Sequence, residues 1–314
     1  MPNTVSQAIP VAPAERETVS CRVCSASTFT PYLTARGYSI VQCDGCGLRY
    51  VNPQPGLEEL EQIYAAYDHG DQWRNGEEKF NQGVKRIILH YKRGGSALDV
   101  GCGSGNFLRC LRAEGFSVLG VEPSKTGSAY TQSAHGIETF HGTVEAFIAS
   151  GTNRRFHVVT ALNVLEHLKD PASILVQLLQ LMRNDGILTL VVPDARLHAL
   201  LGETRRRLGF SDPFWINTEH HPLVGFDPPH HLCSFDPKTI SQLLKRCGFE
   251  PVCLRAAPLV FNADRWKNMA KRVLYSLSEA LYWLTFRQIT LGYSTLLVAR
   301  KAGGVRIQSE TRVG

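Results

Sequence analysis

The segment ALDVGCGSGNF, residues 97–107, decides the fold class of this 314-residue chain. Its first four residues read as a buried strand, and Gly101, Gly103 and Gly105 then form a glycine-rich turn. Helical spacing of apolar residues resumes from Leu108 onwards. A strand, a tight turn and a helix N-terminus bring backbone N–H groups close to a ligand. The segment therefore predicts an α/β fold that holds a cofactor at this turn.

Two further features narrow the identity of this ligand. Asn106 occupies the position where a dinucleotide-binding turn has its third glycine, which argues against a nicotinamide dehydrogenase. The apolar run 118–121 ends in Glu122, about twenty residues after the turn, where an acidic residue binds ribose hydroxyls. This combination fits an adenosyl ligand without a phosphate.

Several motifs in a fixed order resemble those of a known family. Residues 98–107 resemble the first motif of class I S-adenosylmethionine-dependent methyltransferases, and residues 121–124 resemble the second. Residues 156–168 are similar to the fourth strand and the loop after it in the small-molecule branch, and residues 186–193 to the fifth strand. The resemblance implies a Rossmann-like seven-stranded sheet with helices on both faces, and S-adenosyl-L-methionine as the cofactor.

The resemblance also assigns residues to the cofactor site. Glu122 is expected to bind the ribose, Thr143 and Val144 the adenine, and Asn163 to lie near the methyl-transfer centre. Tyr67, in the preceding segment, is expected either to cover the cofactor or to be a core residue. The full set of expected cofactor-binding residues is Tyr67, Asp99, Gly101, Cys102, Gly103, Gly105, Glu122, Thr143, Val144 and Asn163.

Four of the nine cysteines have the spacing of a metal site. Cys21, Cys24, Cys43 and Cys46 form two C-x2-C pairs separated by eighteen residues, a pattern typical of structural zinc sites. A redox dithiol pair is the alternative interpretation. The cysteine segment also resembles a zinc-binding extension that precedes some methyltransferases acting on sugars and natural products. We expect a small zinc-ribbon-like module with one structural Zn2+.

The acceptor side is expected in the histidine-rich segment that follows the fifth strand. His231 resembles a family histidine that faces the acceptor pocket, and its unperturbed pKa of about 6.5 suits removal of a proton from a hydroxyl. His230, His221 and Asp194 are the lesser candidates for this base. The competing interpretation is that these residues only order the loop or hold a metal.

Two local features flank this segment. Asp236 is expected to cap a helix over about 237–247. The pair Glu166-His167 belongs to a loop that recurs in the small-molecule branch, and we interpret it as a structural element of that loop.

The last third of the chain carries the positive charge. Residues 201–314 hold sixteen Lys and Arg against nine Asp and Glu, whereas the whole chain has a formal net charge of +6. Within it, an insertion at about 263–287 has apolar residues at helical spacing with basic residues opposite. We favour a lid or a homodimer surface for this helix. Peripheral contact with a membrane is the alternative.

The predicted organisation comprises two tails, a cysteine module, a linker and a catalytic domain. Their bounds are 1–20 for a disordered tail, 21–52 for the zinc-binding module, 53–95 for a helical linker, 96–301 for the methyltransferase domain and 302–314 for a second disordered tail. A secretory signal and an apolar run of 18 residues are both absent from the sequence, so we expect a cytoplasmic protein, with membrane association at most peripheral.

The predicted activity is methyl transfer to a hydroxyl of a small molecule, such as a sugar or a natural product. An RNA methyltransferase that uses the zinc module and the basic last third is the alternative. The sequence after the fourth strand, Asn163-Val164-Leu165-Glu166, lacks the Asn/Asp-Pro-Pro-aromatic motif of exocyclic-nitrogen methyltransferases, which argues against a nucleic-acid partner. A non-catalytic protein that retains the adenosyl pocket is the third hypothesis.

Overall fold

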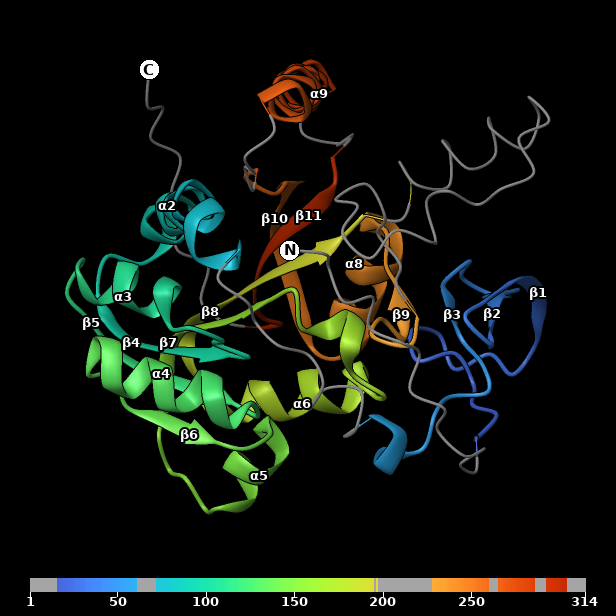
Figure 1. Ribbon diagram of the computed structural model, residues 1–314, viewed down its shortest axis with the longest axis horizontal. Coiled ribbons are helices and arrows are strands. Elements are labelled where there is room, and N and C mark those ends of the chain that lie inside the picture. Colours follow the sequence, from blue (N-terminus) through green and yellow to red (C-terminus); the bar gives the residue numbers. More distant parts are fainter. Residues whose placement is uncertain are drawn as a thin grey trace, which may run out of the picture.

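A seven-stranded sheet forms the centre of the computed structural model, which describes residues 16–60, 72–194, 196, 228–259, 265–285 and 292–303. The strand order is β10-β11-β8-β7-β4-β5-β6 (Figure 1). Strands β4 to β8 pair in parallel, whereas β11 runs antiparallel to both of its neighbours. The strands are β4 (Gly95–Val100), β5 (Phe116–Glu122), β6 (Thr139–His141), β7 (Phe156–Leu162), β8 (Met182–Pro193), β10 (Phe249–Ala256) and β11 (Ser294–Lys301). The predicted seven-stranded α/β sheet is confirmed.

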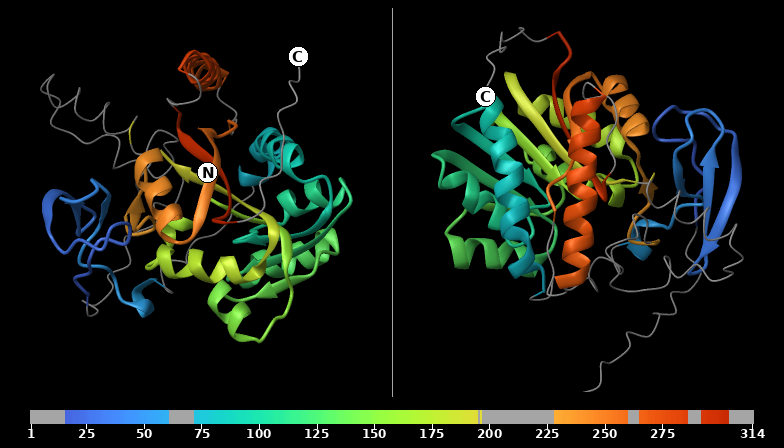
Figure 2. Two further views of the ribbon diagram at one scale, coloured as in Figure 1. Left: turned by 180° about the vertical axis from the view of Figure 1, so that it is seen from behind. Right: turned by 90° about the horizontal axis from the view of Figure 1, so that it is seen from above.

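Helices cover both faces of this sheet, as predicted, because its central strands are apolar on both sides. One face packs against α2 (Gln72–Tyr91) and α3 (Asn106–Arg112). The other face packs against α5 (Val144–Ala149), α6 (Pro171–Leu181) and α8 (Pro237–Arg246) (Figures 1 and 2). Along β4, Ala97 faces the first layer while Leu98 and Val100 face the second, as strand alternation requires.

The N-terminal region forms a second, antiparallel sheet of four strands. Its strands are β1 (Phe29–Ala35), β2 (Tyr38–Cys43), β3 (Arg49–Val51) and β9 (Cys233–Ser234), in that order. The fourth strand, β9, belongs to the second half of the chain, and its Cys233 pairs with Tyr50 of β3. The buried side chains of Leu48 and Tyr50 belong to the same apolar core as Phe235 and α8. The two sheets therefore share one hydrophobic core.

Two helices lie in segments for which the sequence indicated helical character. Helix α2 begins at Gln72, within the segment expected to be a helical linker. The helix of the insertion, α9, covers Arg265–Leu284 and connects β10 to β11. None of the helices in the described part of the chain is both long and apolar enough to span a membrane.

Candidate functional site

The glycine-rich turn follows β4, and its backbone explains why three glycines are needed. Gly101, Gly103 and Gly105 all have positive φ angles, of 67°, 52° and 71°. A Cβ atom at Gly101 would lie 2.7 Å from Cγ2 of Val164, and one at Gly105 would lie 2.5 Å from Cγ2 of Thr131. The turn is therefore packed tightly from two sides and tolerates no side chain at these two positions.

Gly103, the remaining glycine of the turn, borders open space among the described residues, and the side chain of Glu122 lies beside it. A Cβ atom at Gly103 would meet no other atom within 4 Å. The N–H of Gly103 donates to Oε2 of Glu122 at 2.7 Å, and the N–H of Ser124 donates to Oε1 at 2.8 Å. An ionised carboxylate offers about four acceptor positions, so about two remain on Glu122 for ligand hydroxyls.

Two further predicted residues lie beneath the turn. The carboxylate of Asp99 is buried and accepts a hydrogen bond from Oγ1 of Thr160 at 2.6 Å. The thiol of Cys102 packs against Gly120, where a Cβ atom would come within 2.5 Å of its sulfur. Burial, together with the nearby carboxylates of Asp99 and Glu122, raises the pKa of Cys102. Its side chain is therefore a neutral packing group at physiological pH.

The residues expected near adenine begin α5. Thr143 caps this helix, because its side chain accepts the N–H of Ala146 at 3.3 Å. Val144 is buried in the apolar core. The N–H of the preceding Gly142 donates to the backbone carbonyl of Glu122 at 3.0 Å, which fixes this helix start beside the carboxylate.

Asn163 lies where β7 ends, at the same edge of the sheet. Its backbone is left-handed, with φ 56°, and its N–H donates to the carbonyl of Val191 at 2.8 Å. Asparagine tolerates this conformation better than most residues, which explains its place in the turn. Tyr67, also expected at the cofactor, lies outside the described residues.

A buried acid and two histidines meet at the next turn of the chain, η1 (Leu165–His167). Ligand atoms of Glu166, His167 and His231 all lie within 4.8 Å of one another. The rings of His167 and His231 are in edge contact, with centroids 4.7 Å apart. The backbone clamps this arrangement, because Leu232 N–H donates to the carbonyl of Glu166 at 2.7 Å. The predicted base His231 therefore has two neighbours that the sequence analysis interpreted only as loop residues.

Glu166 is the only one of the three that is fully buried. Its side chain is 1% exposed, and neither carboxylate oxygen has a hydrogen-bond partner within the described part of the chain. Burial raises the pKa of Glu166 to about 8. The nearest ring nitrogen, Nε2 of His167, lies 4.0 Å from Oε1.

The protonation of His167 is constrained from its other side. Nδ1 of His167 donates to the backbone carbonyl of His230 at 2.8 Å. A neutral His167 therefore presents a lone pair at Nε2, on the side of Glu166. One carboxylate oxygen and two imidazole nitrogens could hold a proton between them or a divalent cation.

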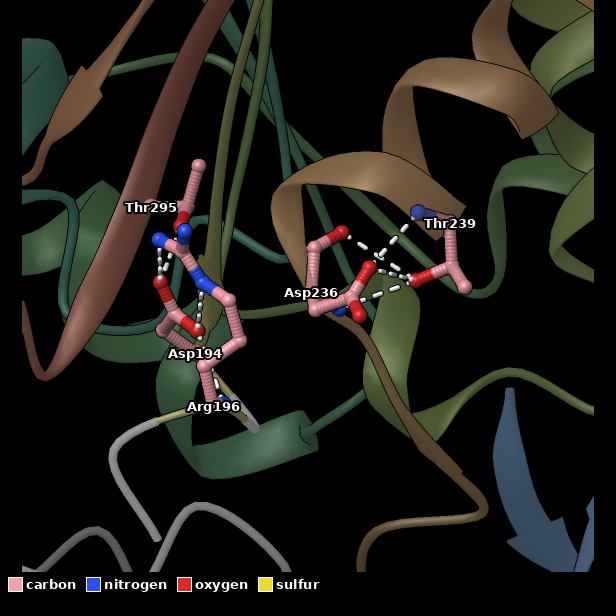
Figure 3. Close-up of polar contacts among 5 residues, drawn as sticks. All are labelled: Asp194, Arg196, Asp236, Thr239 and Thr295. Carbon is pink, nitrogen blue, oxygen red and sulfur yellow. Dashed lines mark hydrogen bonds and ion pairs between the residues drawn. The ribbon is translucent and has the colours of Figure 1, made fainter. Parts of the chain in front are cut away.

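Asp194, at the end of β8, is already engaged in a different network (Figure 3). Its carboxylate forms an ion pair with Arg196, with Nη2 to Oδ2 at 2.8 Å and Nε to Oδ1 at 3.1 Å. The hydroxyl of Thr295 donates to Oδ2 at 3.0 Å. These bonds join the end of β8 to the start of β11.

The start of α8 shows the predicted cap. Asp236 accepts the N–H of Thr239 at 2.7 Å, and the Thr239 hydroxyl accepts the N–H of Asp236 at 2.9 Å (Figure 3). This reciprocal capping box fixes the helix start. Because His231 precedes this cap by five residues, the cap also limits where the histidine lies.

Residues 72–254 match a family model described as a methyltransferase domain. The chain belongs to this methyltransferase domain family. The matched range includes the glycine-rich turn, Glu122 and the histidine cluster.

Relatives of this methyltransferase match over part of its length. Ubiquinone biosynthesis O-methyltransferase of Aromatoleum aromaticum is 32% identical over 98 residues, which cover 30% of this chain and 42% of that protein. The protein of the same name from Nitrosomonas europaea is 31% identical over 116 residues, covering 34% and 49%. The chain thus spans less than half the length of these two relatives.

Two solved structures are similar to the methyltransferase over most of its length. The 1,6-didemethyltoxoflavin-N1-methyltransferase of Burkholderia thailandensis, solved with its substrate and S-adenosylhomocysteine, is 17% identical, with a TM-score of 0.49. The match covers 87% of this chain and 99% of that one. A cyclopropane synthase of Mycobacterium tuberculosis is 16% identical, with a TM-score of 0.49, over 77% and 98% of the two chains.

The four cysteines of the methyltransferase's N-terminal region come together as their spacing predicted. The sulfur atoms of Cys21 and Cys46 are 3.5 Å apart, those of Cys24 and Cys43 are 3.4 Å apart, and all four lie within 4.8 Å of one another. A tetrahedral zinc ion with Zn–S bonds of about 2.3 Å would separate the sulfurs by about 3.8 Å. The donor set and its dimensions therefore fit zinc.

The two C-x2-C turns have equivalent backbones. In the first, the N–H of Ser25 donates to the carbonyl of Cys21 at 2.8 Å, and in the second the N–H of Gly47 donates to Cys43 at 2.9 Å. Ser25 and Gly47 are both left-handed, with φ 62° and 84°. A Cβ atom at Gly45 would lie 3.2 Å from the sulfur of Cys24, so glycine leaves room for the cluster.

Proposed function

We propose that this methyltransferase transfers the methyl group of S-adenosylmethionine to a hydroxyl of a small molecule, a sugar or a natural product, with His231 as the general base. The observation that carries the proposal is the histidine cluster beside the glycine-rich turn. Val164 lies against Gly101, and η1 with His167 follows Val164 in the chain. The ring of His167 contacts the ring of His231. The O-methyltransferase names of the relatives support oxygen as the accepting atom.

The cofactor would be held by the residues around the turn. Glu122 would accept the two ribose hydroxyls on its remaining lone pairs, while Gly103 leaves space for the methionine portion. Asp99 lies beneath the turn as a buried carboxyl group, whose oxygens would favour a cationic ammonium or sulfonium group. Adenine would lie beside the backbone of Thr143 and Val144, because the Thr143 hydroxyl already caps a helix. When bound, S-adenosylmethionine supplies a methyl group on a good leaving group.

The acceptor hydroxyl would be aligned and deprotonated by the histidine cluster. In-line displacement needs the acceptor oxygen close to the methyl carbon and opposite the sulfur, so alignment contributes much of the rate. His231 would take the hydroxyl proton as the new C–O bond forms. His167 and Glu166 would act as positioning residues, and His231 would release the proton to solvent after the transfer.

The remaining predicted residues would have structural functions. The four cysteines would hold one zinc ion that has no open coordination position and takes no part in methyl transfer. Asp194 would anchor the end of β8 through Arg196 and Thr295, and not act as a base. His230 would orient His167 through its carbonyl.

The base is tested with His231→Ala, beside His90→Ala as the control, because His90 is exposed on α2 away from the cluster. Methyl transfer is assayed with a panel of phenolic and sugar hydroxyl acceptors, and S-adenosylhomocysteine affinity is measured by calorimetry. We expect His231→Ala to lower kcat at least about a hundredfold with unchanged S-adenosylhomocysteine affinity. A variant that keeps its kcat and its pH profile would refute the base role.

A further inference from the structure

Helix α9 exposes a row of apolar side chains. Ser278 and Tyr282 are buried against the body of the molecule. Met269, Val273 and Leu277, spaced four residues apart, are 52%, 56% and 61% exposed. Helices on globular proteins usually bury their apolar stripe, so these exposed apolar side chains are unusual.

The exposed apolar side chains are concentrated on this one helix. Seven large apolar side chains are exposed within the described ranges, and four of them belong to α9, including Leu284 at 78%. The other three, Leu57, Val176 and Val252, lie on separate elements. Isolated exposed apolar residues are common, whereas a contiguous stripe marks a surface that another molecule covers.

Basic residues accompany the stripe. The first eight residues of α9 include four Lys or Arg and no acidic residue, and the first acidic residue of the helix is Glu279. Arg272 is exposed next to Val273. An exposed apolar row on a helix rich in basic residues is typical of helices that lie in the interface of an anionic membrane.

The helix is attached at the edge of the sheet that carries the candidate site. It connects β10 to β11 where Ala256 pairs with Thr295, and Thr295 donates to Asp194. Figures 1 and 2 show α9 at the periphery of the molecule, beyond the ends of these strands. A surface that binds α9 would therefore lie near the edge of the sheet where β8 ends.

We propose that α9 docks the methyltransferase on an anionic membrane surface, with Met269, Val273, Leu277 and Leu284 in the headgroup–acyl boundary. A second copy of the chain fits less well as the partner. Four side chains are few against the 20 to 30 residues that each partner contributes to a typical stable interface. The net positive charge of the last third of the chain also opposes self-association and favours anionic lipid.

The proposal is tested by co-sedimentation of the full chain with vesicles of phosphatidylcholine alone or with 30% phosphatidylglycerol. We expect binding to the anionic vesicles at low salt and its loss at high salt. Val273→Glu with Leu277→Glu should lower the vesicle partition coefficient at least about tenfold, because each replaces an apolar group that would enter the membrane by a charge. Arg272→Glu should also weaken binding.

Val176→Glu is the matched control, because Val176 is 47% exposed on helix α6. It should bind like the unaltered protein, and circular dichroism should show that all variants are folded. The absence of binding to anionic vesicles at low salt, binding unchanged in the double variant, or equal binding to neutral vesicles would each overturn the proposal. It would also be overturned by a dimer in sedimentation equilibrium that the double variant dissociates, if no vesicle binding accompanies it.

Discussion

Replacing Glu166 by glutamine should change how the stability of the protein depends on pH. Burial raises the pKa of Glu166 from 4.5 to about 8, so the folded state keeps a proton that the unfolded state releases. Between these pH values the folded state binds more protons, and the free energy of unfolding falls as pH rises. One proton corresponds to about 1.36 kcal/mol per pH unit, hence about 3 kcal/mol between pH 5 and pH 7.

Glutamine cannot ionise, so the Glu166→Gln variant should lose this dependence and gain stability relative to the unaltered protein as pH rises. Urea denaturation followed by circular dichroism at pH 5, 6 and 7, with no divalent metal added to the buffer, measures the difference. Glu138→Gln serves as the control, because Glu138 is an exposed partner of Arg154. Parallel curves for Glu166→Gln and the unaltered protein would refute the reasoning. They would mean that Glu166 is ionised and balanced by a protonated histidine.

Three other substitutions test separate parts of the structure. Gly105→Ala combines a positive φ with a contact of 2.5 Å to Thr131, and should destabilise the protein by roughly 2 kcal/mol or more in urea denaturation. Cys43→Ser removes one of four sulfur ligands, so elemental analysis should find far less than one zinc per chain, and the Tm should fall. Asp194→Asn breaks an ion pair and should cost about 1–3 kcal/mol of stability. It should leave the pH dependence of kcat unchanged, since the proposal gives Asp194 no proton to transfer.

The sequence predicted those features that depend on neighbouring residues. The glycine-rich turn, the acid at Glu122 and the cap at Asp236 each have a local signal, because a few adjacent residues determine the backbone there. The cysteine spacing predicted a cluster for the same reason. The prediction of a seven-stranded sheet followed from a resemblance carried by these local motifs.

Features made by distant contacts could not be predicted from the sequence. Glu166 looked like a loop residue, and only its burial beside His231, sixty-five residues later, sets it apart. The spacing of apolar residues in α9 predicted an amphipathic helix but not which of its apolar side chains would be exposed. The engagement of Asp194 by Thr295 depends on β8 and β11 lying side by side. In each case the deciding neighbour is supplied by the tertiary structure.

The pairing of β3 with β9 has a consequence for the synthesis of the protein. Tyr50 leaves the ribosome 183 residues before its partner Cys233, a delay of roughly 10 to 40 seconds at 5–20 residues per second. During that interval the cysteine turns can close around a metal, but the edge of β3 has no strand beside it. The N-terminal sheet, although its first three strands are made early, is thus completed only after β9 has been synthesised. A chain truncated before residue 233 would leave the edge of β3 unpaired and prone to aggregation.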